Sequence, residues 1–284
     1  MHLHSTYTLL CLIICNVVST IGQCPVYDEI VITSRCNNEV LKEIVENATT
    51  SAIEKYIART QTTTSCPPPA TLPRDCLDVK SRGNGVSDIY SVYPDETEAN
   101  GFDVRCDMDT DAGGWTFIQR RVSDTDFYKS WNEYKQGFGD LNGNFWLGND
   151  RIVALCHGVN CELRIDMMLG NERRYAEYSS FSMEDETGLY KLHVSEFTGT
   201  AGDAFASRNN NNNFSTYDRD NDAYSGNCAE KLHGAWWYDS CHVSNLNGDY
   251  GNTAYAQGLT WWPWTGFYAS LSITEMKVRR VPEK

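Results

Sequence analysis

The sequence has few basic residues for its acidic content. It contains 24 Lys and Arg against 38 Asp and Glu, and its formal net charge is −14. Nucleic acids and anionic membrane surfaces both select clusters of Lys and Arg. We therefore expect no nucleic-acid partner and no anionic membrane surface as a partner. Calcium and neutral or cationic ligands fit this charge.

Long apolar runs are also lacking. The stretch Leu9–Val18 is apolar but too short to span a bilayer, and small residues follow it, with Thr20 and Gly22 at the −3 and −1 positions of a cleavage site. This pattern is typical of a secretory signal peptide. We expect residues 1–22 to be that signal peptide, and the mature protein to be secreted, extracellular and without a membrane span.

The usual signatures of catalysis are absent as well. The sequence has no Gly-x-Ser-x-Gly, no His-Glu-x-x-His, no P-loop and no dinucleotide fingerprint. Asp239, Ser240 and His242 lie too close together in the sequence to converge as a catalytic triad. The sequence therefore predicts that the protein is not an enzyme.

Cysteine is abundant by contrast. Two of the eleven cysteines, Cys11 and Cys15, lie in the expected signal peptide, so nine remain in the mature chain. In an oxidising compartment these cysteines are expected to pair. Because nine is odd, at least one is free or bonds another chain.

Residues 23–65 form a small N-terminal segment with one expected helix, Asn38–Arg59. An isolated helix of this length is marginal in water and needs a partner for its apolar face. We expect the helix to self-associate, and packing onto the C-terminal domain is the alternative. The helix is predicted by apolar residues at helical spacing: Val40, Leu41, Ile44, Val45, Ala48, Ala52, Ile53, Tyr56 and Ile57.

A Pro-rich linker, residues 66–73, separates this segment from residues 74–284. The second part is rich in turn residues, with short apolar runs between them. It predicts strands at Trp115–Ile118 and Cys161–Leu169, and short helices at Trp131–Tyr134 and Asn149–Cys156. The polar tract Asn209–Asn213 is predicted to be a surface loop. Two sequons predict N-glycosylation, at Asn47 and Asn213.

Three carboxylates alternate within five residues, at Asp218, Asp220 and Asp222. Carboxylates this close repel one another unless a cation lies among them, and Ca²⁺ takes six to eight oxygen ligands, backbone carbonyls included. The loop therefore predicts a calcium site, with a solvated acidic turn as the alternative. It is not an EF-hand, because Ala223 and Ala229 occupy the positions that require Gly and Glu.

Further motifs resemble those of a fibrinogen-related domain, and the match follows residues 74–284 in order. Within that family, the motifs are most similar to those of ficolins and tachylectins. The chain differs from ficolins because it has no Gly-X-Y run for a collagen stalk. The motifs are Cys76 to Cys106, Gly113-Gly114-Trp115-Thr116, Phe127 to Gly139, Phe145-Trp146-Leu147-Gly148, Phe214-Ser215-Thr216, the Asp loop, Cys228-Ala229, Gly234-Ala235-Trp236-Trp237, Cys241-His242, Ser244 to Gly248 and Glu275-Met276-Lys277.

The resemblance implies an α+β fold of the fibrinogen C-terminal type. It consists of a small N-terminal subdomain, a central twisted antiparallel sheet and a loop-rich calcium-binding subdomain, here preceded by the oligomerising helix. The family pattern implies the disulfides Cys76–Cys106 and Cys228–Cys241, and Cys156–Cys161 is expected as an additional pair close in sequence. That leaves Cys24, Cys36 and Cys66 as candidates for bonds between chains, which fits a disulfide-linked homo-oligomer.

The resemblance also implies the calcium ligands. They fall on the side chains of Asp220 and Asp222 and on the backbone carbonyls of Tyr224 and Gly226. Asp218 is expected to lie outside this set. The calcium ion is expected to shape the loop rather than to contact a sugar.

The ligand pocket of the family lies beside this loop and grips an acetyl group in the lectin members. In the family, the floor of this pocket includes a cis peptide before the second cysteine of the disulfide. The resemblance therefore implies a cis peptide at Ser240–Cys241, with the backbone N–H groups of Cys241 and His242 directed at the acetyl oxygen. One wall is expected from Tyr255 beside Ala256, and another from the set Trp264, Phe267 and Tyr268.

One position departs from the lectin pattern, because Leu232 stands where several lectin members have Tyr. Leucine packs against a methyl group but offers no hydroxyl to the ligand. Three tryptophans, Trp236, Trp237 and Trp262, are expected in the core because of the general preference of Trp for burial.

Two functions follow from these expectations. The first is a secreted calcium-dependent lectin that recognises acetylated glycans on microbial surfaces, in innate immune pattern recognition and agglutination. The second is a secreted protein ligand, or an adhesion component of the extracellular matrix, that binds a receptor or peptide through the same pocket. Leu232 favours the second slightly, because it removes a polar contact to a sugar.

Overall fold

The structure, a computed structural model, describes residues 72–95 and 101–281. These residues belong to one compact unit, Leu72–Lys284. The expected signal peptide, the helix Asn38–Arg59, the inter-chain cysteines and the sequon at Asn47 all lie outside the described residues, as does most of the linker 66–73. They stay predictions.

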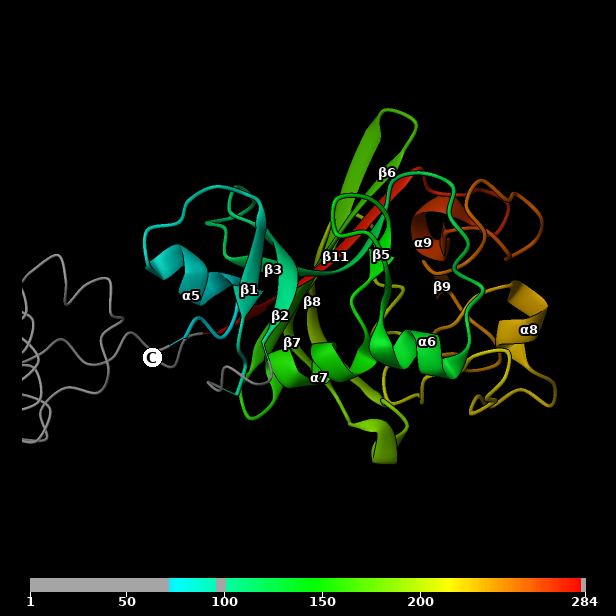
Figure 1. Ribbon diagram of the computed structural model, residues 1–284. Coiled ribbons are helices and arrows are strands. Elements are labelled where there is room, and N and C mark those ends of the chain that lie inside the picture. Colours follow the sequence, from blue (N-terminus) through cyan, green and yellow to red (C-terminus); the bar gives the residue numbers. More distant parts are fainter. Residues whose placement is uncertain (1–71, 96–100, 282–284) are drawn as a thin grey trace, which may run out of the picture. The chain divides into compact units, whose positions relative to one another are not determined.

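An antiparallel sheet is the centre of the fold (Figure 1). Its strands follow the order β1-β2-β3-β11-β6-β7-β8, so the last strand in sequence lies between β3 and β6, and β5 pairs with both β3 and β4. A separate two-stranded ladder joins β9 and β10. The strands are β1 Ile89–Val92, β2 Phe102–Asp107, β3 Trp115–Arg121, β4 Phe138–Gly139, β5 Phe145–Trp146, β6 Cys161–Leu169, β7 Glu172–Met183, β8 Leu192–Gly199, β9 Ser244–Asn245, β10 Thr260–Trp261 and β11 Ile273–Arg280.

Short helices connect these strands. They are α5 Cys76–Ser81, α6 Trp131–Gln136, α7 Asn149–Cys156, α8 Cys228–Leu232, α9 Trp262–Thr265 and the 3₁₀ helix η2 Glu186–Gly188. A capping box starts α6, because Ser130 and Glu133 each accept a backbone N–H of the other. The predicted helices at Trp131–Tyr134 and Asn149–Cys156 are confirmed, and the α+β antiparallel fold is the expected one.

Buried and partly exposed side chains alternate along the central strand β6. In β6, Leu163, Ile165 and Met167 are buried, whereas the residues between them are partly exposed. This strand and the one predicted at Trp115–Ile118, now part of β3, are confirmed. Lys277 in β11 breaks the simple pattern, because it is buried and forms ion pairs with Asp107 at 2.6 Å and Asp166 at 2.7 Å.

The two ends of the described domain differ in character. At one end, α5, β1 and β2 form the small subdomain, which the Cys76–Cys106 disulfide ties together. At the other end, α8, α9 and β9 lie among long connecting segments (Figure 1). Cys156–Cys161 joins the end of α7 to the start of β6, and Cys228–Cys241 lies in the loop-rich end. These three pairs are the ones expected for the C-terminal part of the chain.

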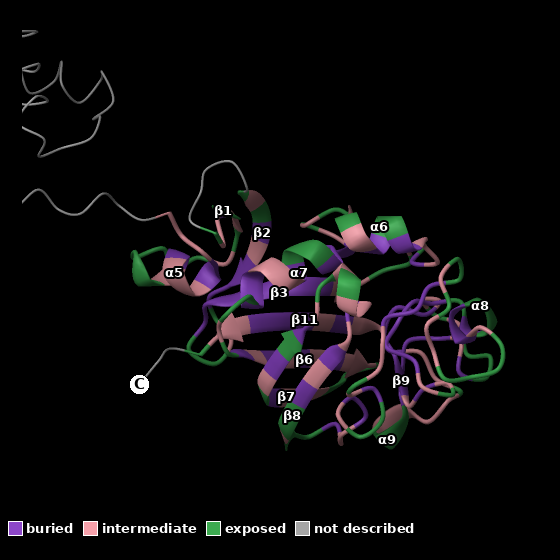
Figure 2. Cartoon of the chain, turned by 90° about the horizontal axis from the view of Figure 1, so that it is seen from below, coloured by how far each residue is buried: buried purple, intermediate pink, exposed green. Residues whose placement is uncertain are grey.

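Buried residues run along the central strands and continue into the segment around β9 (Figure 2). An aromatic cluster joins the two regions. The Trp146 ring of β5 lies 6.2 Å from Trp237, and Phe214 packs on both at 6.0 and 5.2 Å between centroids. Trp236 and Trp237 are fully buried, as predicted. The loop-rich end therefore shares one apolar core with the sheet.

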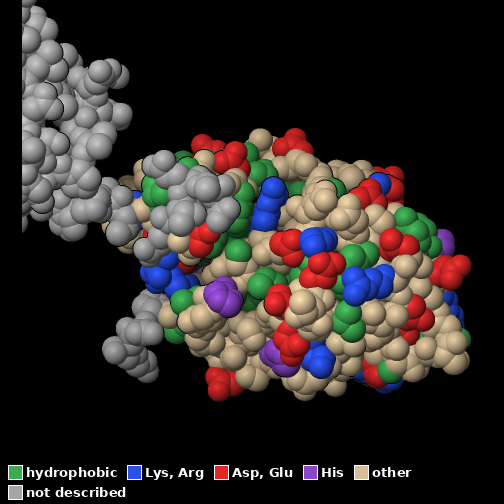
Figure 3. All heavy atoms as spheres, turned by 60° about the horizontal axis from the view of Figure 1, so that its bottom comes forward, with side chains coloured by type: hydrophobic (Ala, Val, Ile, Leu, Met, Phe, Trp, Pro, Cys, Tyr) green, Lys and Arg blue, Asp and Glu red, His purple; other side chains and the backbone are tan. Residues whose placement is uncertain are grey.

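The surface seen in Figure 3 mixes charges of both signs, with acidic and basic side chains lying beside one another. Ion pairs also join neighbouring strands, such as Arg120–Glu275 between β3 and β11 and Arg279–Glu162 between β11 and β6.

No helix in residues 72–95 and 101–281 has the length and apolar content needed to cross a membrane.

Two polar side chains of β3 hold the loop-rich end to the sheet. The side-chain amide of Gln119 donates to the Leu246 carbonyl at 3.0 Å and to the Asn247 side chain at 2.9 Å. Arg121 donates to the carbonyls of Leu246 and Gly248 at 3.3 and 3.0 Å. Both side chains are fully buried, so these bonds replace water for a stretch of irregular backbone.

The prediction of a surface loop at Asn209–Asn213 is wrong at its first residue. Asn209 is fully buried. Its amide donates to the Trp237 carbonyl at 2.8 Å and its oxygen accepts from the Ser244 hydroxyl at 2.8 Å. Asn211 is exposed, as expected. The five asparagines of this tract look alike in the sequence, so the sequence does not show that contacts with Trp237 and Ser244 bury the first of them.

We expect Arg121→Met to lower the free energy of unfolding by about 2–4 kcal/mol, because the buried Gly248 carbonyl loses this donor and the Leu246 carbonyl retains only Gln119. Urea unfolding at pH 7, followed by tryptophan fluorescence, measures the change. Arg173→Met is the control, because Arg173 is exposed on β7. Equal destabilisation by the two substitutions would contradict this role of Arg121.

Candidate functional site

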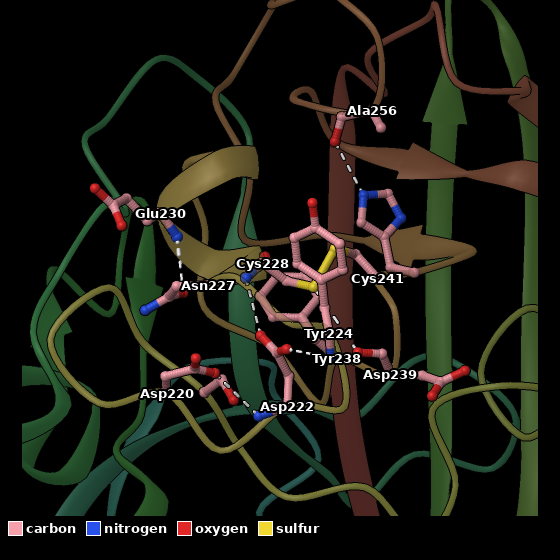
Figure 4. Close-up of a disulfide and its surroundings, with 12 residues drawn as sticks. Asp220, Asp222, Tyr224, Asn227, Cys228, Glu230, Tyr238, Asp239, Cys241 and Ala256 are labelled. Carbon is pink, nitrogen blue, oxygen red and sulfur yellow. Dashed lines mark hydrogen bonds between the residues drawn. A yellow bond between two sulfur atoms is a disulfide. The ribbon is translucent and has the colours of Figure 1, made fainter.

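Helix α8 and the disulfide at its start organise the loop-rich end (Figure 4). The Asn227 side chain caps the helix by accepting the Glu230 backbone N–H at 3.0 Å. Cys228, the first residue of α8, is bonded to Cys241. The acidic loop that precedes α8 and the segment that follows Ser240 are therefore held beside one helix.

The carboxylates of Asp220 and Asp222 lie close together below α8 (Figure 4). Asp222 accepts the backbone N–H groups of Tyr224 at 2.8 Å and Cys228 at 2.9 Å, and Asp220 accepts that of Asp222 at 3.2 Å. Burial, reinforced by the negative charge of Asp220, raises the pKa of Asp222 to about 6. Such a pair favours a proton or a cation between its oxygens.

The oxygens of this loop fit a calcium ion. The carbonyls of Tyr224 and Gly226 accept no hydrogen bond from the described residues, so they are available beside the two carboxylates. No three His, Cys, Asp or Glu side chains of the described part are arranged to hold a metal. A calcium site here would therefore depend on backbone oxygens, which calcium accepts.

Asp218 makes its hydrogen bonds outside this set. Its carboxylate accepts the Trp131 backbone N–H at 2.9 Å and the Thr216 hydroxyl at 2.7 Å. These bonds attach the acidic loop to the start of α6. Asp218 thus anchors the loop.

A pocket of about 510 Å³ lies beside α8 and the disulfide. Six of the seven expected ligand-binding residues line it: Leu232, Ser240, Cys241, His242, Tyr255 and Ala256. The seventh, Tyr268, is not among the lining residues, but its ring packs on Tyr255 at 5.4 Å between centroids. Its role in ligand binding stays a prediction. Sequence reasoning missed Arg208, Tyr224, Lys231, Val243 and Trp262, and Phe267, one of three candidates for a wall, also lines the pocket.

The segment Ser240–Val243 forms one side of this pocket. The Ser240–Cys241 peptide is cis, as the resemblance implied. Neither the Cys241 nor the His242 backbone N–H donates to any acceptor in the described part of the chain. Two adjacent donors in a pocket wall are therefore free for a ligand oxygen.

His242 is buried against this wall. Its Nε2 lies 2.9 Å from the Ala256 carbonyl, and its ring packs edge-on against Phe267 at 5.8 Å. Burial lowers the pKa of His242 to about 4, so the ring is neutral at pH 7. Since Nε2 faces a carbonyl, it bears the proton, and the buried Nδ1 is an acceptor without a partner among the described residues.

Exposed aromatic rings gather around the pocket mouth. Tyr255, Trp262 and Tyr224 line it with exposures of 56%, 52% and 38%, and Tyr268 adjoins Tyr255. The prediction that Trp262 is a core residue is therefore wrong. Trp262 is the first residue of the short helix α9 and Pro263 is the second, so strand β10 ends at Trp261 and the Trp262 ring lies at the surface.

Asn245 of β9 holds the parts of the pocket together. Its amide donates to the Leu232 carbonyl at 3.3 Å and the Ala256 carbonyl at 3.4 Å, and its oxygen accepts the Tyr238 hydroxyl at 2.8 Å. Gly234 makes room for this contact, because a Cβ there would lie 2.8 Å from the Asn245 oxygen. The pocket walls thus converge on one buried amide.

The fold and this pocket define an α+β binding domain with its site in a loop-rich end. The chain belongs to the fibrinogen C-terminal domain family, because the family model for the C-terminal globular domain of fibrinogen beta and gamma chains matches residues 72–281. The fold and the family resemblance are thereby confirmed. Domains of this family act in binding, and the absence of enzyme activity stays a prediction.

Several relatives are similar to this domain. Techylectin-5A of Tachypleus tridentatus is 46% identical over 219 residues, which cover 74% of each chain. Tenascin-R of Homo sapiens is 43% identical over 208 residues, and the match covers 73% of this chain but 15% of tenascin-R. Family membership therefore includes both a protein named as a lectin and a much longer protein.

Two solved structures share the fold. The fibrinogen-like globe domain of human ANGPTL2 is 40% identical with a TM-score of 0.71, and the match covers 74% of this chain and all of that one. A lamprey fibrin D-dimer complexed with the peptide Gly-His-Arg-Pro-amide is 28% identical with a TM-score of 0.69, covering 97% and 96% of the two chains.

Acid should destabilise the fold partly through His242. The unfolded chain protonates this histidine near pH 6.5, but the folded protein does so only near pH 4, so stability falls as the pH drops between these values. We expect His242→Gln, which retains a donor toward the Ala256 carbonyl, to reduce the loss between pH 7 and pH 4 by up to about 3 kcal/mol. Urea unfolding across this range measures it.

His157→Gln is the control for this experiment, since His157 is exposed directly after α7 and lies outside the pocket lining. It should keep the wild-type loss of stability in acid. An unchanged pH slope in His242→Gln would show that the histidine is not held neutral by burial.

Proposed function

We propose that this protein is a secreted, calcium-dependent lectin that recognises the acetyl group of N-acetylated glycans on microbial surfaces. The observation that supports it most directly is the pair of unengaged N–H groups at Cys241 and His242 in a pocket wall. An acetyl oxygen accepts two hydrogen bonds, and a sugar ring fits a pocket of this size.

The apolar side of the pocket suits the acetyl methyl group. Leu232 and Ala256 are almost fully buried lining residues, and the ring of Tyr255 is an exposed wall beside them. We propose that the methyl group packs against these three side chains while the oxygen meets the N–H pair. The exposed aromatic rim would then contact the sugar ring.

Calcium would act on the shape of this site. We propose that Asp220 and Asp222, with the carbonyls of Tyr224 and Gly226, hold the ion, which supplies the positive charge that this carboxylate pair lacks. The loop continues directly into α8, which bears Leu232, and Tyr224 itself lines the pocket. An ordered loop would therefore fix two parts of the pocket.

A second candidate is a protein ligand or a component of adhesion or matrix that binds a peptide or receptor. Leu232 is the observation that favours it, because a buried leucine offers no hydroxyl to a sugar. The lamprey fibrin structure was solved with a peptide, and tenascin-R is among the relatives. The lectin function has the support of the unengaged N–H pair and of the similarity to Techylectin-5A.

Beads that carry N-acetylglucosamine should retain the protein in calcium and release it in chelator, whereas beads that carry glucose should not retain it. Asp222→Asn should lower retention at least tenfold at limiting calcium, because the loop loses one of its two carboxylates. Asp103→Asn, at an exposed position of strand β2, is the matched control and should bind like wild type. Thermal unfolding in the same buffers reports whether each variant is folded.

Equal retention on both bead types would contradict acetyl recognition. If the folded protein binds neither type but binds a peptide or host protein that N-acetylglucosamine does not displace, the second candidate is correct. Retention that survives chelator would remove calcium from the proposal and leave the acetyl pocket in place.

We also propose that the N-terminal segment joins chains through Cys24, Cys36 and Cys66, because a single shallow site binds weakly and clustering raises avidity by about 10²–10⁴-fold. Mild reduction should then convert oligomers to monomers in light scattering and abolish agglutination of N-acetylglucosamine-coated particles. The triple Cys→Ser variant should behave in the same way without reductant. A monomer that agglutinates as well as wild type would contradict this assembly.

A further inference from the structure

Two cations line the pocket of a strongly acidic protein. Lys231, in the last turn of α8, and Arg208, in the segment after β8, are both lining residues. The lining includes no Asp or Glu, although the chain as a whole has a formal charge of −14. The sign of the charge at the pocket is therefore opposite to that of the protein.

Lys231 has no carboxylate partner among the described residues. Its side chain is exposed, and its Nζ lies 5.0 Å from the centre of the Tyr224 ring, a contact that holds the ammonium group over a pocket-lining residue. The Gln257 side chain donates to the Lys231 backbone carbonyl at 3.4 Å. The ammonium group is thus kept at the pocket and remains free for an anion.

Arg208 is only partly neutralised. Its Nε donates to Asp239 at 2.9 Å, and its side chain is 46% exposed. Its two Nη groups have no partner in the described part of the chain. A guanidinium held by one side in this way presents its remaining N–H donors in a fixed plane, which matches the geometry of a carboxylate or sulfate.

The acidic groups nearby do not cancel these charges at the pocket. Asp239 is occupied by Arg208. Glu230 projects from α8 away from the disulfide (Figure 4). Its negative charge lies near Tyr128, where, after burial, it contributes to the raised pKa of that tyrosine. Asp220 and Asp222 are the proposed calcium ligands, and a bound calcium ion would balance their two charges. With calcium bound, Lys231 would leave the pocket with a net positive charge beside its apolar wall.

We propose that the pocket selects N-acetylated sugars that also bear an anionic group, a carboxylate or a sulfate, facing Lys231 and Arg208. This inference rests on the proposed lectin function and narrows its ligand class. Partly exposed ion pairs contribute little free energy, so each cation should raise the affinity for an anionic sugar by only a few-fold. Added salt weakens the preference, because these charges are open to solvent.

Competition on N-acetylglucosamine beads tests the proposal with the full-length protein in calcium. N-acetylmuramic acid is compared with its methyl ester, and N-acetylglucosamine 6-sulfate with N-acetylglucosamine, so that each pair differs in charge at one group. At low salt we expect at least one anionic probe to displace the protein at about three- to tenfold lower concentration than its neutral counterpart. In 1 M NaCl the ratio should fall toward one.

Lys231→Gln should reduce this ratio to about twofold or less. Lys80→Gln is the matched control, because it removes the same charge from α5, at the opposite end of the described domain (Figure 1). It should keep the wild-type ratio. Comparison of ratios, instead of affinities, separates a loss of anion selection from a general loss of folded pocket.

Three outcomes would overturn the proposal. Equal competition within both probe pairs, with N-acetylglucosamine still active, would reject anion selection and leave the acetyl lectin standing. An equal fall in Lys80→Gln and Lys231→Gln would assign the preference to net charge and not to the pocket. Failure of every acetylated probe would reject the proposed function together with this inference. A preference in one pair alone supports the proposal and identifies the anion.

Discussion

The hydrogen bonds from Gln119 and Arg121 to the 246–248 loop are the contacts on which the rest of the structure depends. The loop-rich end has little regular structure, so its buried backbone groups must find partners elsewhere. Strand β3 supplies them from the middle of the sheet. The loop held in this way begins with β9, whose Asn245 binds the carbonyls of Leu232 and Ala256. The sheet is thus connected to the pocket by two successive sets of buried hydrogen bonds. The first runs from Gln119 and Arg121 to the 246–248 loop, and the second runs from Asn245 to the pocket walls.

This construction explains why the pocket differs from the surface around it. A rigid buried support allows apolar and aromatic side chains to remain exposed at the mouth, where they would otherwise be drawn into the core. Tyr255 and Trp262 are more than half exposed, yet their neighbour Ala256 is buried. The same support leaves the N–H groups of Cys241 and His242 unengaged. Exposed rings, free donors and two cations in one hollow are features of a binding surface.

Much of the domain was predictable because its information is local. The alternation in Cys161–Leu169 sets which face of β6 is buried, and a capping residue precedes the predicted helix that begins at Trp131. The acidic loop was recognisable from the spacing of its carboxylates. Lys277 shows the limit of such patterns. It lies between the buried residues Met276 and Val278, where an alternating pattern places an exposed side chain, yet it is buried. Its partners Asp107 and Asp166 come from two other strands.

By itself the sequence determined the family, two of the strands, two of the helices and most of the residues that line the pocket, because motifs and periodicity are properties of short segments. Only the tertiary structure decided that Trp262 lines the pocket, that the Tyr268 ring packs on Tyr255, and that Asn209 is buried. It also brought Arg208 to Lys231 at one hollow. These placements depend on contacts between segments far apart in the chain, and no local pattern of residues encodes them.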